Sequence, residues 1–161
     1  MEQCTIEVDL IRQCLSVKRG REVLRQYLVS TSRYGPGERM GSNCTPRGHH
    51  KIRAKIGAGL PPGSVLLGRR FTGEIYSAEL ARSQPERDWI LSRILWLSGL
   101  EPGLNRFGCV DSMRRYIYIH GTPDTEIIGV PCSHGCVRMR NTDVIELFDI
   151  VPPGTPVVLH T

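Results

Sequence analysis

Two histidines and one cysteine, residue types that carry out acid–base and nucleophilic chemistry, lie within seventeen positions as His120, His134 and Cys136. A thiol is a weak nucleophile until it ionises or a base takes its proton, and a nearby imidazole can bring about either. Cys136 and His120 are therefore the candidate nucleophile and base. Acyl transfer through a thioester is the chemistry that such a pair supports.

A predicted β-strand must hold His120. Residues 116–120, Tyr-Ile-Tyr-Ile-His, alternate as a half-buried strand does, so the two tyrosines (Tyr118 among them) and His120 share one face and the isoleucines point into the core. The next four residues, Gly-Thr-Pro-Asp at 121–124, are turn-forming. His120 is thus expected at the end of a rigid strand, from which the chain can return to bring Cys136 alongside.

Cys136 itself is expected on a tight loop. Gly135 precedes it, and Asn-Thr-Asp at 141–143 follows shortly, before an apolar helical pattern. Glycine next to the thiol lets backbone N–H groups approach a substrate oxygen, as an oxyanion hole requires. The loop is therefore predicted to bind the negative charge that develops during acyl transfer.

The motif Ser-His-Gly-Cys-Val-Arg-Met at 133–139, with Ile-His-Gly-Thr-Pro at 119–123, resembles the catalytic signature of the YkuD-type L,D-transpeptidases. These enzymes remodel the stem peptides of peptidoglycan. The resemblance implies that Cys136 is the nucleophile, that His120 is the base and that the Gly121 carbonyl orients the imidazole. It further implies an oxyanion site shaped by Ser133, His134 and Gly135.

The same resemblance suggests which residues bind substrate. Arg138 stands where the family carries asparagine or arginine, and is a candidate anchor for a substrate carboxylate. Thr-Pro-Arg-Gly at 45–48 resembles an element that borders the family's substrate cleft, so Thr45 is a candidate as well. Tyr118, on the predicted face of His120, completes the set.

The family implies cleavage of tetrapeptide stems between diaminopimelate and D-alanine. An L,D-carboxypeptidase that trims muropeptides during recycling is the first hypothesis, and an L,D-transpeptidase that forms cross-links or exchanges the terminal D-amino acid is the second. A binding module that holds stem peptides without chemistry is the third. The complete set of His120, His134 and Cys136 argues against that third hypothesis, because a binder has no need for an activated thiol.

Hydrolysis is preferred over transpeptidation because of the location expected for this protein in the cell. The first residues show no basic segment followed by an apolar one, and no run approaches eighteen apolar residues, so a cytoplasmic protein without a membrane segment is expected. Soluble muropeptides or stem peptides are then the expected partners.

The net charge of +5 comes from scattered basic residues, which predicts either a solvated surface or an anion-binding groove. Glycine-rich nucleotide motifs and a Ser-hydrolase elbow are absent, nucleic-acid binding is not expected, and the oligomeric state stays open.

The remaining cysteines are expected to be reduced. Six cysteines form an even number, but a chain of 161 residues has no need of disulfides to fold. Cys132 and Cys136 have a spacing that a zinc site could use, yet no second pair of ligands accompanies them. No metal and no cofactor is therefore predicted, and Cys132 is either a packing residue or an oxidative partner of Cys136.

The chain as a whole predicts a single mostly β domain over residues 1–161. Residues 5–30 alternate as three short antiparallel strands, and further strands are expected at 51–56, 64–67 and 155–159. The expected architecture is a YkuD-like β-sandwich or open barrel of about ten short mixed strands with one or two peripheral helices.

Two helices are predicted, and two stretches are less regular. Residues 85–100 carry apolar side chains at helical spacing after a proline, and residues 143–150 form a shorter helix capped by Asn141 or Thr142. Residues 30–50 are rich in Gly, Pro, Ser and Asn and predict a long functional loop that ends in two surface histidines, His49 and His50. Residues 71–84 give no clear signal.

Overall fold

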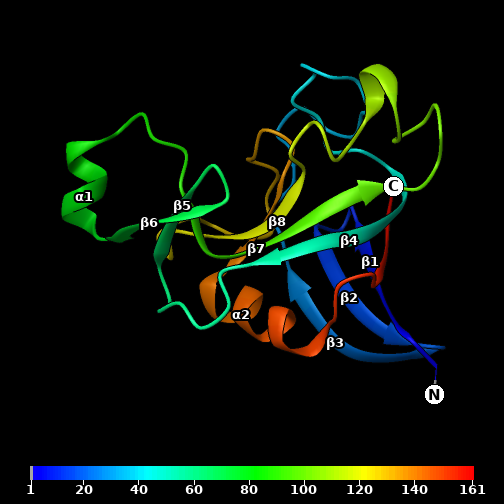
Figure 1. Cartoon of the computed structure of the whole chain (residues 1–161), viewed down its shortest axis with the longest axis horizontal. Helices are drawn as coiled ribbons and strands as arrows, with labels where there is room; N and C mark the ends of the chain where they lie inside the picture. The colour runs from blue at the N-terminus through cyan, green and yellow to red at the C-terminus, as the bar shows by residue number, and fades with distance from the viewer. Residues whose placement is uncertain (1) are drawn as a thin grey trace.

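The computed structural model describes residues 2–161, which form one curled sheet of mixed strands and two helices (Figure 1). The strands are β1 Cys4–Asp9, β2 Cys14–Arg19, β3 Glu22–Leu28, β4 Gly48–Ile56, β5 Ser64–Leu67, β6 Arg70–Ile75, β7 Ile90–Gly99, β8 Tyr118–Thr122, β9 Val137–Arg140 and β10 Pro156–His160. The helices are α1 Ala78–Ser83 and α2 Asn141–Ile150, and a 3-10 turn spans Gly108–Val110.

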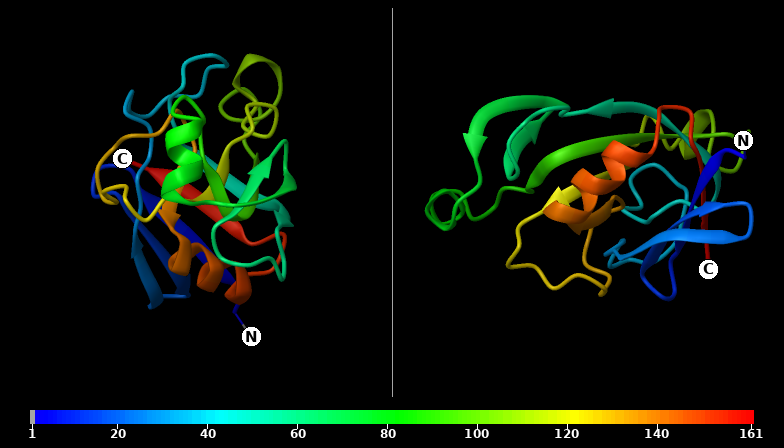
Figure 2. Two further views of the ribbon diagram at one scale, coloured as in Figure 1. Left: turned by 90° about the vertical axis from the view of Figure 1, so that its left-hand side faces the viewer. Right: turned by 90° about the horizontal axis from the view of Figure 1, so that it is seen from below.

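The sheet has the order β3-β2-β1-β10-β4-β7-β5-β6, and β8 and β9 branch from β7. β10 lies between β1, which it pairs in parallel, and β4, which it pairs antiparallel. The sheet curls around a core that α2 covers from one side, while β5, β6 and α1 extend away from it (Figure 2). The predicted mostly β open barrel with one or two helices is confirmed.

Several predicted strands are also confirmed. Residues 5–30 form β1, β2 and β3, and the strands at 64–67 and near the C-terminal end are β5 and β10. The strand expected at 51–56 begins earlier, at Gly48. His50 is consequently not a surface residue: it is fully buried, and its ring nitrogens lie 3.0 Å from the Gly48 carbonyl and 2.8 Å from the Ser112 hydroxyl. Two satisfied nitrogens make that burial possible.

The helix predicted at 85–100 is wrong, because this segment contains β7. Leu95 and Leu97 face the main core, whereas Ile94 and Trp96 face a second apolar cluster on the opposite side of the sheet. A strand buried on both faces lacks the alternation of apolar and polar residues, so its run of large side chains also matches a helical period. The proline and acidic residues that resembled a helix start lie in the loop before the strand.

The second predicted helix is confirmed as α2, but its cap differs. The N-cap residue is Arg140 rather than Asn141 or Thr142. Asn141 is the first helical residue, and its amide nitrogen donates to the Thr122 carbonyl at 2.9 Å instead of capping the helix. Residues 71–84, which gave no signal, form most of β6 and the short helix α1.

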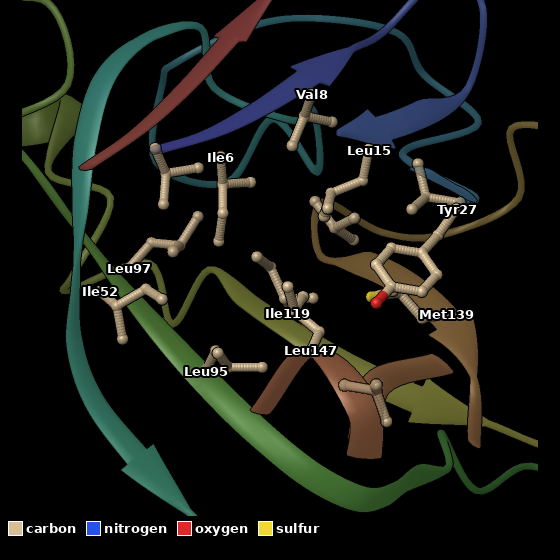
Figure 3. Close-up of a cluster of buried hydrophobic side chains, with 14 of the residues drawn as sticks. Ile6, Val8, Leu15, Tyr27, Ile52, Leu95, Leu97, Ile119, Met139 and Leu147 are labelled. Atoms are coloured by element: carbon tan, nitrogen blue, oxygen red, sulfur yellow. The ribbon is translucent and has the colours of Figure 1, made fainter. Parts of the chain in front are cut away.

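The main core fills the concave side of the sheet beneath α2. Its fully buried side chains include Ile6, Leu15, Leu95, Ile119 and Leu147, which converge from five elements (Figure 3). Burying one such side chain stabilises the fold by roughly 1.5–3 kcal/mol. This core fixes β7 and β8, the two strands on which the candidate site depends.

A smaller cluster lies on the other face of the sheet. Leu66, Ile94 and Tyr118 are its buried members, and Trp96 and Cys136 pack against it. The candidate nucleophile thus lies on the face of β7 and β8 that points away from the main core.

Within residues 2–161, no helix is long and apolar enough to cross a membrane.

Replacing a leucine of β7 tests the burial of this strand in the main core. Leu95→Ala should lower the free energy of unfolding by about 2–5 kcal/mol, because a fully buried side chain leaves a cavity. The matched control Leu67→Ala removes a side chain that is 65% exposed and should cost less than about 0.5 kcal/mol. Chemical denaturation measures both, and equal losses would contradict the central position of β7.

Candidate active site

The parallel pairing of β8 with β9 brings the two halves of the motif together. His120 lies opposite Arg138, and Gly121 lies opposite Met139. His120 therefore stands inside a strand rather than at its end, and Gly121 and Thr122 belong to β8 instead of a turn. Both expectations fail for the same reason: the partner strand β9 extends the ladder past the histidine, so the turn begins only at Pro123.

Cys136 immediately precedes β9 and is held by the backbone of the segment around β8. Its sulfur accepts a hydrogen bond from the Tyr118 N–H at 3.3 Å and donates one to the Tyr116 carbonyl at 3.3 Å. Continuing the ladder register back by one pair puts Cys136 opposite Tyr118. Because side chains alternate along both strands, Cys136 and His120 lie on the same face, as diagonal neighbours.

The imidazole of His120 has a defined orientation. Its Nδ1 lies 2.7 Å from the Gly121 carbonyl oxygen. A carbonyl can only accept, so Nδ1 carries the proton and Nε2 of the neutral ring has a lone pair available for a thiol proton. The side chain is 2% exposed, and burial lowers the pKa of His120, which favours this neutral form.

Gly121 is required by close packing rather than by its backbone angles. A Cβ at this position would lie 2.4 Å from the Asn141 amide oxygen and 2.5 Å from the Leu91 carbonyl oxygen. Neither atom can move easily, since Leu91 is part of β7 and Asn141 is hydrogen-bonded to Thr122, Asp124 and Ser92. Glycine here lets β8 and its histidine approach β7.

The thiol is neutral at rest. Burial raises the pKa of Cys136 to about 11, and Asp88 adds to the rise, while the Tyr118 N–H, Arg138 and Arg115 oppose it. With an ordinary thiol near 8.5, a pKa of about 11 leaves roughly one thiol in a thousand ionised at pH 8. Activation of Cys136 therefore requires proton transfer to a base during attack, rather than a preformed thiolate.

Ser133 and Thr45 hold the loop that carries the thiol. The buried Ser133 hydroxyl accepts the Gly135 N–H at 3.2 Å and donates to the Cys136 carbonyl at 2.6 Å. The Thr45 hydroxyl donates to the Gly135 carbonyl at 2.9 Å and accepts the Ser32 N–H at 3.0 Å. Both side chains thus act on the backbone of the loop, and Thr45, a predicted substrate-binding residue, is 1% exposed.

Gly135 has a backbone that other residues rarely adopt. Its φ is 126°, and a Cβ there would lie 3.2 Å from the Cys44 carbonyl oxygen. Because its N–H is already bonded to Ser133, it is not a free donor for an oxyanion. The backbone N–H groups of His134 and Cys136 donate to no other group of residues 2–161, so they are the donors available in this loop.

The other predicted site residues differ in their surroundings. The Arg138 guanidinium is mostly buried and lies 3.3 Å from Glu126 and 3.2 Å from Asp88, so a substrate carboxylate would have to compete with both. The Tyr118 hydroxyl accepts a hydrogen bond from Arg69 at 3.1 Å. His134 is exposed, with its ring 6.3 Å from that of Tyr34.

Several residues that position the site gave no signal in the sequence. Arg115 donates to the carbonyls of Cys44, Gly37 and Glu38, which ties the long loop before β4 to the segment before β8. Asp88 and Glu126 surround Arg138 from two separate loops. Only the pairing of distant segments makes these contacts, and no local motif encodes them.

Among residues 2–161, no cluster of three or more His, Cys, Asp or Glu side chains is arranged to hold a metal ion.

Comparison with known proteins identifies the family to which this chain belongs. The family described as YkuD, L,D-transpeptidase catalytic domain, matches residues 4–159. The chain therefore belongs to the YkuD family of L,D-transpeptidase catalytic domains.

Individual relatives match over shorter segments. YkuD of Bacillus subtilis, named as an L,D-transpeptidase, is 49% identical over 47 residues, which is 29% of this chain and 29% of that protein. YbiS of Escherichia coli, also named as an L,D-transpeptidase, is 54% identical over 43 residues, or 27% of this chain and 14% of that protein. The matched segments thus span less than a third of these relatives.

Solved structures share the fold across the whole chain. An L,D-transpeptidase from Mycobacterium smegmatis has a TM-score of 0.57 at 20% identity, covering 99% of this chain and 59% of that one. The Enterococcus faecium L,D-transpeptidase C442S mutant has a TM-score of 0.59 at 18% identity, covering 99% and 50%.

Alkylation by iodoacetamide tests the protonation state of the thiol. Because the reactive form is the thiolate and the pKa of Cys136 is about 11, its labelling rate should keep rising about tenfold per pH unit from pH 8 to pH 10. Peptide mapping by mass spectrometry follows the rate, and the exposed Cys109 serves as a reference within the same chain. A plateau for Cys136 near pH 8 would contradict a thiol that burial keeps neutral.

Proposed function

We propose that this protein catalyses acyl transfer on peptidoglycan stem tetrapeptides through a thioester on Cys136, cleaving the bond between diaminopimelate and D-alanine. The observation that carries the proposal is the shared face of Cys136 and His120, with Nε2 of the imidazole left to act as a base. Membership of the YkuD family supports the substrate class.

The first half of the reaction forms the thioester. The thiol proton moves to Nε2 of His120 as sulfur attacks the carbonyl carbon on the C-terminal side of the L-centre. The N–H groups of His134 and Cys136 stabilise the oxyanion, where one donor is worth on the order of 3 kcal/mol. The proton then passes from the imidazolium to the leaving nitrogen, the C–N bond breaks, and D-alanine departs.

The second half depends on the acceptor. Water gives a tripeptide and regenerates the thiol, which is L,D-carboxypeptidase activity, whereas the amine of another stem peptide gives a cross-link. We infer that hydrolysis dominates. The sulfur is partly buried and is held by the backbones of Tyr116 and Tyr118, and water is the smallest acceptor that can reach a thioester there.

Mass spectrometry of the intact protein after exposure to a tetrapeptide tests the first half. A tripeptide acyl adduct should appear on Cys136 and be absent from Cys136→Ala. His120→Gln should lower the acylation rate by about 10²- to 10⁴-fold, the usual contribution of a general base. Cys109→Ala, which removes an exposed thiol elsewhere, should behave as the wild type. Binding of tetrapeptide with no adduct would instead support a non-catalytic binding module.

Product analysis with and without an amine acceptor tests the second half. Tripeptide and free D-alanine should be the main products even when a second tetrapeptide or a D-amino acid is present in excess. The ratio of hydrolysed to exchanged product, measured by liquid chromatography, gives the preference directly. A mainly cross-linked or exchanged product would establish transpeptidation and reject the hydrolase.

A further inference from the structure

A concave site lies farther along the face of the sheet that carries the thiol. Lys51 and Arg53 of β4 alternate with Ile52, a member of the main core, so both cations point to the opposite side of the sheet. By the same alternation, Ser98 of β7 shares that side with Trp96, which packs in the cluster that Cys136 adjoins. The cavity beside Ser98 has a volume of about 190 Å³.

The walls of this cavity are strongly basic. Lys51, Arg53, Arg106 and Arg114 line it, and the one acidic lining residue is Asp111. No carboxylate of residues 2–161 lies within 4.0 Å of the charged nitrogens of these four side chains. Many other basic residues are paired with acids, among them Arg12, Lys18, Arg25, Arg47, Arg87 and Arg138.

The Asp111 carboxylate is hydrogen-bonded to the backbone of the loop and not to the four cationic side chains. One of its oxygens accepts the Phe107 N–H at 2.7 Å and the other accepts the Arg114 N–H at 3.0 Å. These bonds hold Phe107 in a backbone conformation with φ of 69°, which a bulky residue rarely adopts. The Phe107 ring is consequently held at the rim of the cavity, where it is 57% exposed beneath the Arg106 guanidinium, 4.6 Å away.

The basic surface continues past this cavity. A neighbouring depression is lined by Lys51, Ile52, Arg53, Ala54 and Gly154, so the same two basic residues line two hollows. Clustered, unpaired cations in a concave surface attract a ligand with several negative charges. Two adjoining phosphates match this arrangement better than one, and an exposed ring at the rim offers a flat partner for a base.

We propose that this cavity binds a nucleoside diphosphate group, with the diphosphate on Lys51, Arg53, Arg106 and Arg114 and the base against Phe107. The cations come from β4 and from the loop after β7 rather than from a glycine-rich phosphate loop, so a search for nucleotide motifs does not find them. The cavity and Cys136 share a face of the sheet, and the segment 111–118 connects them. The site does not depend on the acyl-transfer chemistry of Cys136.

Titration calorimetry of the whole protein at low salt tests the proposal with three probes. Uridine diphosphate should bind more tightly than inorganic pyrophosphate, and uridine alone should bind least. Arg106→Gln with Arg114→Gln should weaken both phosphate probes at least about tenfold. The matched pair Arg21→Gln with Arg39→Gln removes the same charge from exposed positions outside the cavity and should change affinity less than about twofold.

The Phe107→Ala variant distinguishes the binding of the base from the binding of the diphosphate. It should reduce uridine diphosphate binding to the level of pyrophosphate and leave pyrophosphate itself unchanged. Thermal melts check that each variant is folded, and Lys51→Gln replaces the double variant if that one is not. No binding of either phosphate probe at millimolar concentration, or an equal loss in the Arg21 and Arg39 control, would overturn the proposal. Equal binding of pyrophosphate and uridine diphosphate to the wild type would overturn the role of Phe107.

Discussion

The candidate site depends on one constraint, the register of the parallel pair β8 and β9. β8 carries His120 and the residue immediately before β9 is Cys136, so a slip of one residue would turn one of these side chains to the opposite face. The register is fixed from both sides: Ile119 and Val137 are buried in the main core, and Tyr118 is buried in the second cluster. Packing that has no chemical role thus determines whether the thiol and the imidazole share a face.

The same packing sets the electrostatics of the site. Burial disfavours the charged forms of both Cys136 and His120, so the resting pair is neutral and proton transfer must accompany attack. Hydrogen bonds with backbone groups then orient the two side chains. The Gly121 carbonyl accepts the Nδ1 proton and so fixes the imidazole tautomer, and the Tyr118 N–H donates to the sulfur. The surrounding backbone orients the pair, and the two side chains supply the reactivity.

The sequence predicts the parts of this structure that local patterns encode. The N-terminal strands alternate because only one of their faces is deeply buried, and the motif around Cys136 is a contiguous run of residues. The sequence of β7 resembles a helix because two cores bury both faces of this strand, which removes the period of two. Residues such as Asp88, Glu126 and Arg115 could not be assigned, since their contacts join segments that are distant in the sequence. The hydrogen bonds of Ser133 and Thr45 likewise appear only once the loops are placed.

The position of β10 affects how the molecule can fold. This strand, Pro156–His160, lies between β1 and β4, so the N-terminal hairpins have no ladder to the rest of the sheet until residues 156–160 have been synthesised. Native pairing of Ile6 with Val157 closes nearly the whole chain into one loop. Such remote contacts slow the search for the native state and delay completion of the sheet until β10 has been synthesised. During that interval the open edges of β1 and β4 are exposed to pairing with other chains.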